Sequence, residues 1–237
     1  MFKMKTLKFV LLFSILFGML ACIKDSDYIF DRKDCPVVLQ FSLDFARFYI
    51  LSPIDGPCLI SNIPDEYDQG DALWVDYTIH MKHQEYSNVF SATKLVVHQK
   101  IHINDIKTVT NGNLSDDYQT PIDGFFNKPS CIGKTLYFGF THKAPAEQTF
   151  EYEMLYDLGI QYNPTVYIKS RKTNEATGAE KEVKTMAGFD ITPFINQYKN
   201  ENNELRFYVK YLSEIDDGKE VYSNYGFDML TLYFEPE

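Results

Sequence analysis

Strict alternation of side chains over residues 71–81 constrains the fold more than any other feature of the sequence. Every second residue is large and apolar, namely Leu73, Val75, Tyr77, Ile79 and Met81. The residues between them are Trp74, Asp76, Thr78 and His80. A period of two over this length is typical of an antiparallel strand with one face against a core.

Similar strand patterns occur on both sides of this segment. They cover residues 37–43, 47–51, 58–63 and 94–106, with turn residues such as Asp55-Gly56-Pro57 between them. No stretch with helical periodicity interrupts them. About five strands with short turns predict an all-β fold whose first domain, residues 35–107, is a small OB-like β-barrel.

Residues 135–237 predict a second β domain. Leu205, Phe207, Val209 and Tyr211 alternate along one further strand, and Asp217-Gly218 is a strong hairpin signal. Thr192 followed by Pro193 predicts the N-cap and first residue of a short helix that runs through Tyr198. Six or seven strands in this block predict an antiparallel β-sandwich.

The two domains are separated by residues 108–134, which are rich in Pro, Gly, Asn and Asp. A structureless stretch of this length is unusual inside one compact domain, so the sequence predicts a linker here.

The N-terminus carries a targeting signal. Lys3, Lys5 and Lys8 precede an apolar run over residues 9–21, the pattern of a secretory signal peptide over residues 1–21. The run is shorter than the roughly 20 residues that a transmembrane helix needs, so a retained membrane span is the weaker alternative.

The run ends in Met19-Leu20-Ala21-Cys22, which resembles a bacterial lipobox. The resemblance implies that Cys22 is acylated, for example with palmitate, and becomes the new N-terminus. The alternative is a simple secretory signal with an incidental cysteine. Each buried CH₂ of an acyl chain contributes about 0.8 kcal/mol to membrane binding, so a lipid anchor replaces a span.

The residues after the lipobox indicate where the protein is displayed. Residues 23–27, Ile-Lys-Asp-Ser-Asp, resemble the surface-export signal of Bacteroidetes lipoproteins. We therefore expect a protein anchored in the outer membrane and exposed at the cell surface. Residues 22–34 then form a tether or a first edge segment.

Charge excludes one class of partner. The chain has 33 acidic and 23 basic residues, and its formal net charge of −10 becomes −13 once the three lysines of the signal are removed. Such a chain repels phosphate backbones and anionic lipid, so we expect no nucleic-acid partner and a membrane contact that depends on the lipid anchor.

Cys35, Cys58 and Cys131 remain if Cys22 is acylated. An odd number leaves at least one thiol free in an exported protein. Two readings stay open: a disulfide between Cys35 and Cys58, or three buried cysteines that pack as small hydrophobic residues. No C-x-x-C pair is present, which excludes a zinc ribbon.

Two segments carry a family resemblance. Residues 70–78, GDALWVDYT, and residues 188–193, GFDITP, resemble segments of the NigD-like lipoproteins of Bacteroidetes. The resemblance implies a lipobox, an N-terminal OB-like barrel and a C-terminal β-sandwich. It brings no catalytic residues.

Histidines provide the first candidate chemistry. His98 and His102 are four positions apart on a predicted strand and therefore share a face, whereas His80 and His83 do not. Asp76 shares a face with His80, but no further ligand completes a set. We interpret these residues as polar groups on a solvated face and expect no metal or cofactor.

Carboxylate pairs lie in turns: Asp65-Glu66, Asp116-Asp117 with Asp123 nearby, and Asp216-Asp217. Their spacing matches no calcium loop. No G-x-S-x-G nucleophile motif and no Walker loop occurs. The sequence therefore predicts a protein that is not an enzyme and has no catalytic residues.

The 17 tyrosines and 19 phenylalanines leave two readings. Exposed tyrosines such as Tyr208, Tyr222 and Tyr225, together with Trp74, would stack on sugars or contact a partner. Alternatively, they are ordinary strand formers. The leading hypothesis is a non-enzymatic binding or accessory module with an unknown protein or glycan partner. The alternatives are a fimbrial or adhesin subunit and a surface glycan-binding protein.

Overall fold

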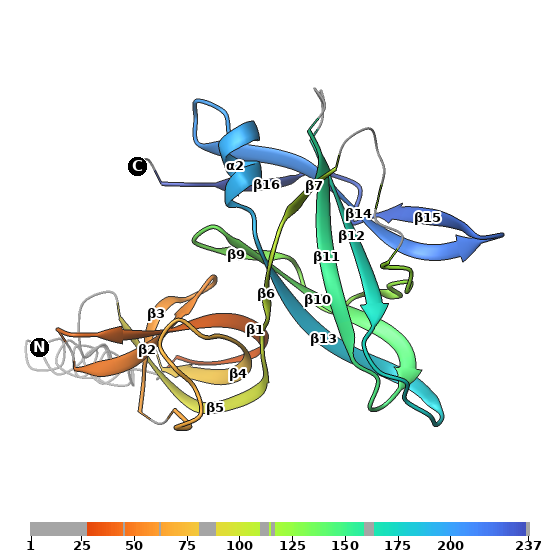
Figure 1. The fold of residues 1–237 in the computed structure, drawn as a ribbon. Helices are drawn as coiled ribbons and strands as arrows, with labels where there is room; N and C mark the ends of the chain where they lie inside the picture. The colour runs from red at the N-terminus through yellow and green to blue at the C-terminus, as the bar shows by residue number, and fades with distance from the viewer. Residues whose placement is uncertain are drawn as a thin grey trace, which may run out of the picture.

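The structure is a computed structural model that describes residues 28–44, 46–61, 63–80, 89–109, 114, 117–158 and 164–235. These residues form a small barrel followed by two larger sheets and one short helix (Figure 1). The predicted all-β class is therefore confirmed. No helix among the described residues is long and apolar enough to cross a bilayer. The predicted signal peptide and Cys22 lie outside these residues.

Five strands close the barrel in the order β1-β2-β3-β5-β4. They are β1 (Ile29–Ser42), β2 (Arg47–Ser52), β3 (Gly56–Ile60), β4 (Ala72–His80) and β5 (Phe90–Lys100). β3 and β5 run parallel, and the other pairs are antiparallel. This five-stranded closed arrangement confirms the OB-like barrel that the strand patterns predict.

The alternation along β4 places its apolar residues in the barrel core. Leu73, Val75 and Ile79 are fully buried there. The opposite face of β4 was expected to face solvent, but Trp74 and Thr78 on that face are also buried. Trp74 lies against Phe126 of the second part of the molecule, with 5.1 Å between ring centroids.

The second part has two sheets. The first has the order β6-β13-β10-β8, with β9 also paired to β10, and the second has the order β15-β14-β12-β11-β7, with β16 also paired to β14. The strands of the first sheet are β6 (Ile103–Asp105), β8 (Gly124–Phe125), β9 (Ser130–Ile132), β10 (Thr135–Pro145) and β13 (Glu180–Asp190). Those of the second are β7 (Lys107–Val109), β11 (Phe150–Asp157), β12 (Thr165–Lys172), β14 (Glu204–Asp216), β15 (Lys219–Asn224) and β16 (Leu230–Tyr233).

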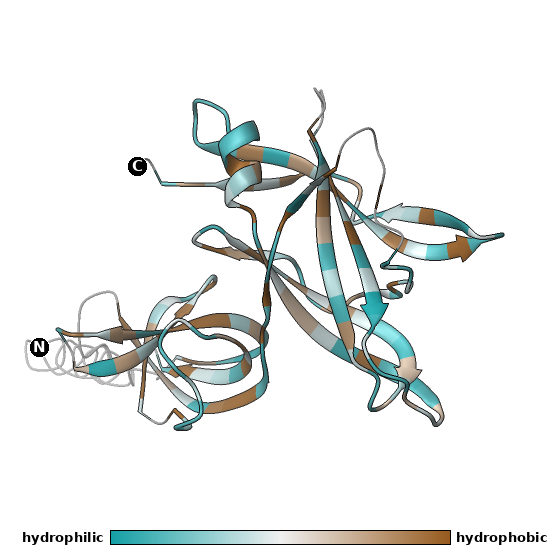
Figure 2. Ribbon diagram, viewed as in Figure 1, coloured by the Kyte–Doolittle hydropathy of each residue, from teal (hydrophilic) through white to brown (hydrophobic). Residues whose placement is uncertain are grey.

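An aromatic core joins these two sheets. Phe138, Phe140, Phe189 and Phe207 are fully buried within it. Hydrophobic and hydrophilic residues alternate along the strands on the hydropathy-coloured ribbon (Figure 2), as packing of one face predicts. The β-sandwich predicted for this part is therefore confirmed, but its sheets are mixed rather than wholly antiparallel, because β12 pairs in parallel with β14.

The hairpin turn predicted at Asp217-Gly218 is confirmed. Asp217 and Gly218 connect β14 to β15 with φ values of 47° and 76°, the left-handed pair that a two-residue hairpin turn requires.

The start of the helix differs from the prediction. Helix α2 (Thr192–Tyr198) ends as expected, but its N-cap is Ile191, with no side-chain cap. Thr192 is not the cap because its N and Oγ1 both donate to Asp190 Oδ1, at 2.9 and 2.6 Å. The carboxylate of Asp190 thus fixes the chain as it enters the helix.

Strand pairing extends into segments predicted to be irregular. β1 begins at Ile29, so part of residues 22–34 is the first edge segment rather than a tether. Within residues 108–134, β8 and β9 pair with β10. β6 and β7 pair in parallel with β13 and β11, so the chain enters both sheets directly after β5. The division into domains at 35–107, 108–134 and 135–237 stays a prediction.

The barrel and the first sheet share a separate apolar cluster, which we call the junction cluster. It consists of Ala72, Trp74, Ile101, Ile132, Tyr137 and Met186. The side-chain amide of Gln99 adds two hydrogen bonds to the backbone of Met186. The two parts therefore contact one another through side chains as well as through the connecting strands.

Candidate functional site

A cavity of about 820 Å³ opens at the side of the barrel where β3 and β5 pair in parallel. We call it the barrel cavity. β2, β3, β5 and the segment before β4 contribute its walls. Its apolar lining is Phe48, Leu59, Ile60, Ile63, Pro64 and Ala92, and its polar lining is Arg47, Ser61, Asp65, Tyr67, Asp68, Ser91 and Thr93.

This lining combines features of a ligand site. Phe48 and Tyr67 contribute partly exposed aromatic rings, and both pack against the barrel core. Ser91 and Thr93 add hydroxyl groups from β5. Small-molecule sites typically have volumes of about 300–1,000 Å³, with mostly apolar walls and a few polar groups. The cavity therefore suits an organic ligand with both apolar and polar parts.

Sequence patterns did not single out this cavity. Phe48 was predicted only as a strand residue, and Tyr67 lies in a loop without periodicity. Of the predicted candidates, only Asp65 lines the cavity.

A largely buried polar cluster fixes the turn between β2 and β3. Arg32 donates from Nε and Nη2 to the Asp55 carboxylate at 2.8 and 2.6 Å, and Tyr77 donates to the same carboxylate at 2.7 Å. Burial alone would raise the pKa of Asp55. The hydrogen bonds from Arg32 and Tyr77 outweigh this effect and hold that pKa below its ordinary value. The turn between β2 and β3 is thereby fixed to β1 and β4.

Cys35 and Cys58 are both buried in the barrel core and are free thiols. Burial raises the pKa of Cys35 to about 11 and that of Cys58 to about 12. Cys131, on β9, is also free, and burial raises its pKa to about 11. For Cys35 and Cys58 the structure agrees with the interpretation as small buried hydrophobic residues, whereas Cys131 is only partly buried.

Asp34, Asp76 and His98 approach one another on the outside of the barrel, near the junction cluster. Asp34 lies in β1, Asp76 in β4 and His98 in β5. One ligand atom from each lies within 4.8 Å of the others, and His98 Nε2 is 3.1 Å from Asp76 Oδ1. The sequence reading paired Asp76 with His80 and His98 with His102, so it did not find this grouping.

The other histidines have separate surroundings. His80 Nε2 lies 3.0 Å from Thr93 Oγ1, His102 is exposed, and His83 is outside the described residues. His142 was not among the sequence candidates. It is buried, with Nδ1 3.0 Å from Pro121 O and Nε2 2.8 Å from Tyr152 Oη. Burial lowers its pKa to about 4.

Among the described residues, none of the carboxylates predicted in turns belongs to a group of three side chains that could hold a metal ion. Asp123 accepts a hydrogen bond from Lys143 N. Asp116 is outside the described residues. Asp216 and Asp217 lie at the exposed β14–β15 turn.

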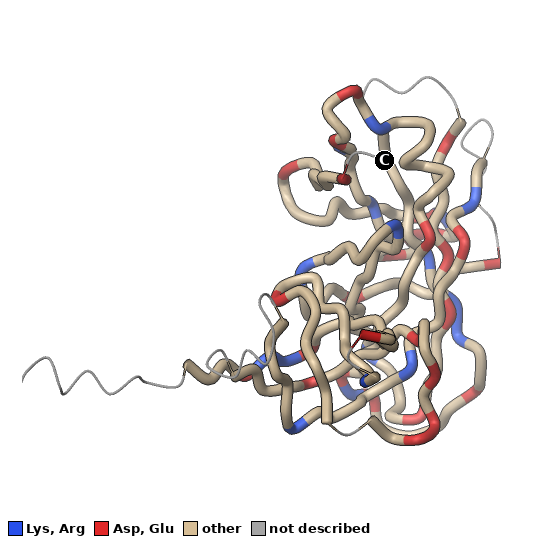
Figure 3. Tube along the Cα trace, turned by 90° about the vertical axis from the view of Figure 1, so that its left-hand side faces the viewer, with Lys and Arg blue, Asp and Glu red and all other residues tan. Residues whose placement is uncertain are grey.

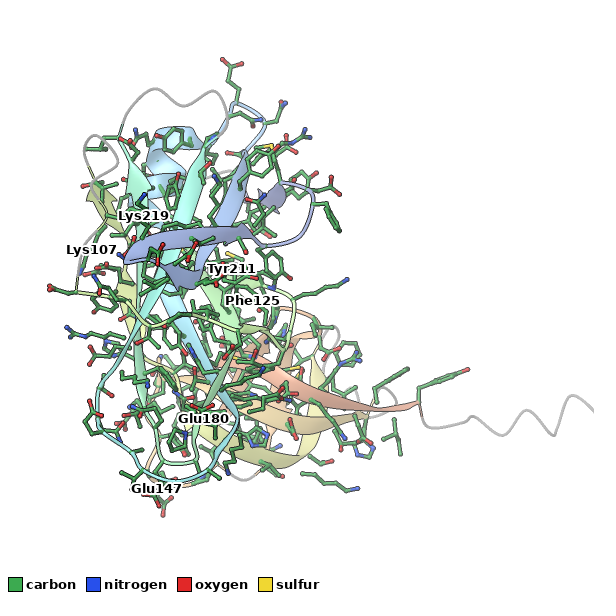
Figure 4. All side chains as sticks on the ribbon, turned by 90° about the vertical axis from the view of Figure 1, so that its right-hand side faces the viewer. Lys107, Phe125, Glu147, Glu180, Tyr211 and Lys219 are labelled. Carbon is green, nitrogen blue, oxygen red and sulfur yellow. The ribbon has the colours of Figure 1, made fainter. Side chains whose placement is uncertain are left out.

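The tyrosines expected to be exposed are partly buried. Tyr222 donates to Glu220 Oε2 at 2.7 Å, and Tyr225 packs edge-on against Phe125 at 4.8 Å. Tyr208 is also only partly exposed. Tyr211 packs against the other side of this aromatic group and lies beside Phe125 in Figure 4. Together with the burial of Trp74, this corrects the expectation of an exposed sugar-stacking set on these residues.

Charges of both signs are interspersed along the chain (Figure 3). Two ion pairs of the second sheet each have one buried member. The exposed Lys107 contacts the buried Glu153 at 2.9 Å, and the buried Lys169 contacts the partly exposed Glu220 at 2.5 Å. Lys169 has no exposed surface, and Glu153 Oε1 is buried without a hydrogen-bond partner among the described residues. These ion pairs were not predicted, because Lys169 and Glu153 sit at ordinary alternating strand positions.

Comparison with known proteins identifies the fold. No family model matches the sequence, and a search of curated proteins found no match. An uncharacterised protein from Parabacteroides merdae has a TM-score of 0.66 at 13% identity, over 87% of this chain and 100% of that one. A candidate lipoprotein from Bacteroides fragilis has a TM-score of 0.57 at 10% identity, over 84% and 96%.

A NigD-like immunity protein from Bacteroides caccae also matches, with a TM-score of 0.54 at 10% identity, over 84% of this chain and 92% of that one. These matches span the barrel and the sandwich together. The chain therefore has the fold of the NigD-like proteins, as the motifs at residues 70–78 and 188–193 indicated.

Proposed function

We propose that this chain is a lipid-anchored accessory protein of the bacterial cell envelope that acts by binding a ligand and not by catalysis. The barrel cavity carries the proposal, because it combines a suitable volume with aromatic and hydroxyl groups. The fold shared with a candidate lipoprotein supports the anchor. We assign the lipid to Cys22 and the location to the outer membrane, with the folded part facing outward.

Metabolic labelling tests the anchor. Cells that express the full chain are grown with radiolabelled palmitate and fractionated. We expect the label to enter the protein, and we expect Cys22→Ser to abolish labelling and release the protein from the membrane fraction. Cys131→Ser is the matched control and should keep the label. An unlabelled wild-type protein, or Cys22→Ser that stays in the membrane fraction, would contradict the anchor.

Binding is tested on protein that starts at residue 23 and so retains every described element. It is applied to arrays of glycans and peptides, and the same compounds are assayed for turnover. We expect binding that Phe48→Ala and Tyr67→Ala each weaken at least tenfold. Tyr233→Ala, an exposed residue of the sandwich, is the control and should change nothing. Turnover of any compound would overturn the assignment as a non-enzymatic module.

A surface glycan-binding protein is the second candidate. The aromatic rings and hydroxyl groups in the barrel cavity favour it, since sugars present both apolar faces and hydroxyl groups. Binding confined to the glycan array would select this candidate. Binding confined to the peptides would exclude it and leave the broader proposal in place.

A fimbrial or adhesin subunit would need an N-terminal strand that another copy can replace. β1 pairs with β4 along its first part and with β2 along its second part. Val37 and Leu39 of the same strand are fully buried in the barrel core. Its removal would open the barrel, so we expect monomers in size-exclusion chromatography rather than a ladder of oligomers.

A further inference from the structure

We propose that Asp34, Asp76 and His98 bind one transition-metal dication of the Zn²⁺ class beside the junction between the barrel and the sandwich. Their ligand atoms already lie within 4.8 Å of one another. Ligands at about 2.0 Å from a tetrahedral zinc ion are roughly 3.3 Å apart. The 3.1 Å between His98 Nε2 and Asp76 Oδ1 is therefore close to the separation of two ligands of one ion.

Two irregularities in strand pairing bring the three side chains together. Between β1 and β4 the register shifts after Arg32, so that Asp34 is part of an insertion and adopts a φ of 55°. Between β4 and β5, Trp74 pairs with Gln99 and Val75 with Val97, which leaves His98 as the extra residue. β-bulges redirect side chains and are common beside functional sites. The two strands beside β4 thus each direct a side chain toward Asp76: β1 contributes Asp34 and β5 contributes His98.

Further contacts fix the geometry of the two carboxylates. The backbone N of Asp34 donates to Asp76 Oδ1 at 2.8 Å, and Trp74 Nε1 donates to Asp34 Oδ1 at 3.2 Å. These contacts hold both carboxylates in place beside His98. The Trp74 ring also lies 5.0 Å from the His98 ring and limits its movement.

The ligand types select the ion. Two carboxylates and a neutral imidazole carry a charge of −2, which matches a dication, while Lys33 nearby offsets part of the surrounding negative field. Imidazole suits Zn²⁺ and similar ions, whereas Ca²⁺ and Mg²⁺ prefer oxygen ligands alone. Three protein ligands leave a fourth tetrahedral position for water or a ligand atom. The side chains of Asp76 and His98 are each 33% exposed, so an ion reaches them from solvent.

The site also contacts the sandwich. Asn127 Nδ2 donates to Asp34 O at 3.3 Å, and Asn127 Oδ1 accepts from Gly139 N at 2.8 Å. An ion held by β1, β4 and β5 would therefore stabilise the barrel at the point where it meets β10. The proposal depends neither on the barrel cavity nor on the lipid at Cys22.

The single tryptophan of the chain, Trp74, provides the readout, because its indole contacts Asp34. Zn²⁺ is titrated into protein that starts at residue 23, and the signal is followed by tryptophan fluorescence and by calorimetry. We expect one ion per chain, a change in emission, and binding at least tenfold tighter than that of Ca²⁺. Asp76→Asn and His98→Gln should each weaken binding at least tenfold.

His102→Gln is the matched control, because His102 is an exposed histidine four positions later and should leave binding unchanged. Zn²⁺ should also raise the melting temperature of the wild type and of His102→Gln, but not that of His98→Gln. If Asp76→Asn does not fold, His98→Gln decides, since its side chain lies at the surface. No change in emission up to millimolar Zn²⁺, or equal binding by wild type and His98→Gln, would overturn the proposal.

Discussion

Arg32 donates two hydrogen bonds to the carboxylate of Asp55, at 2.8 and 2.6 Å, and so joins β1 to the turn between β2 and β3. The Asp55 side chain is only 4% exposed, which leaves its charge dependent on this partner. Removing one member of a buried ion pair leaves the other charge without a partner in a poorly solvated position.

We therefore expect Arg32→Ala to lower the free energy of unfolding by about 2–4 kcal/mol in urea denaturation. The matched control is Arg171→Ala, which removes the exposed pair with Glu151 and should lower the free energy of unfolding far less. Equal losses in the two variants would show that the buried pair adds no special stability.

The buried histidine predicts a specific acid sensitivity. Because the folded protein lowers the pKa of His142 from 6.5 to about 4, protonation favours the unfolded state. The stability that neutral His142 contributes is present above pH 6.5 and is lost as the pH falls toward 4, by roughly 3 kcal/mol in total. Urea denaturation at several pH values measures this slope. His142→Gln should flatten it, and a slope unchanged in that variant would contradict the assignment.

Gly139 is required by close packing at the junction. A Cβ atom there would lie 2.5 Å from Phe126 Cζ and 2.6 Å from Asn127 Oδ1. We expect Gly139→Ala to lower the free energy of unfolding by about 1–3 kcal/mol. Gly124→Ala is the control and should lower the free energy of unfolding less, because its Cβ would meet only Thr141 Oγ1, at 3.3 Å.

A double-mutant cycle identifies the cause of that loss. Adding Phe126→Ala to Gly139→Ala removes the ring that the new methyl group meets, so the two losses should be less than additive. Strict additivity would show that the loss has another origin.

Thiol accessibility tests the state of the cysteines. Protein that starts at residue 23 should show almost no reaction with a thiol reagent at pH 8, because burial raises the pKa of all three thiols to about 11 or higher. Unfolding in denaturant without reductant should then release three thiols per chain. Release of only one would instead indicate a disulfide between two of the cysteines.

The architecture was predictable where one strong local signal was enough. The alternation in β4 and β14 predicted strands, and Asp217-Gly218 predicted the hairpin between β14 and β15. The short strands β6, β7, β8 and β9 have two or three residues each, too few to show a period. Their pairing depends on partners far away in the sequence.

The candidate sites were less predictable for a related reason. Alternation places His98 on one face and Asp34 in an irregular segment. The β-bulges that contain Asp34 and His98 bring both residues to Asp76, and no sequence pattern marks these bulges. The barrel cavity depends on a loop that brings Tyr67 to the same cavity as Phe48, and no local pattern in the sequence encodes this arrangement.

The parallel pairing of β6 with β13 and of β7 with β11 limits how this protein can be divided. Cutting the chain after β7 and discarding the N-terminal side removes an outer strand from each of the two sheets. Bare β13 and β11 would then present unpaired backbone groups, a template for self-association. The sandwich therefore needs the strands that follow the barrel directly. Isolated sandwich fragments that begin after residue 109 should aggregate during expression.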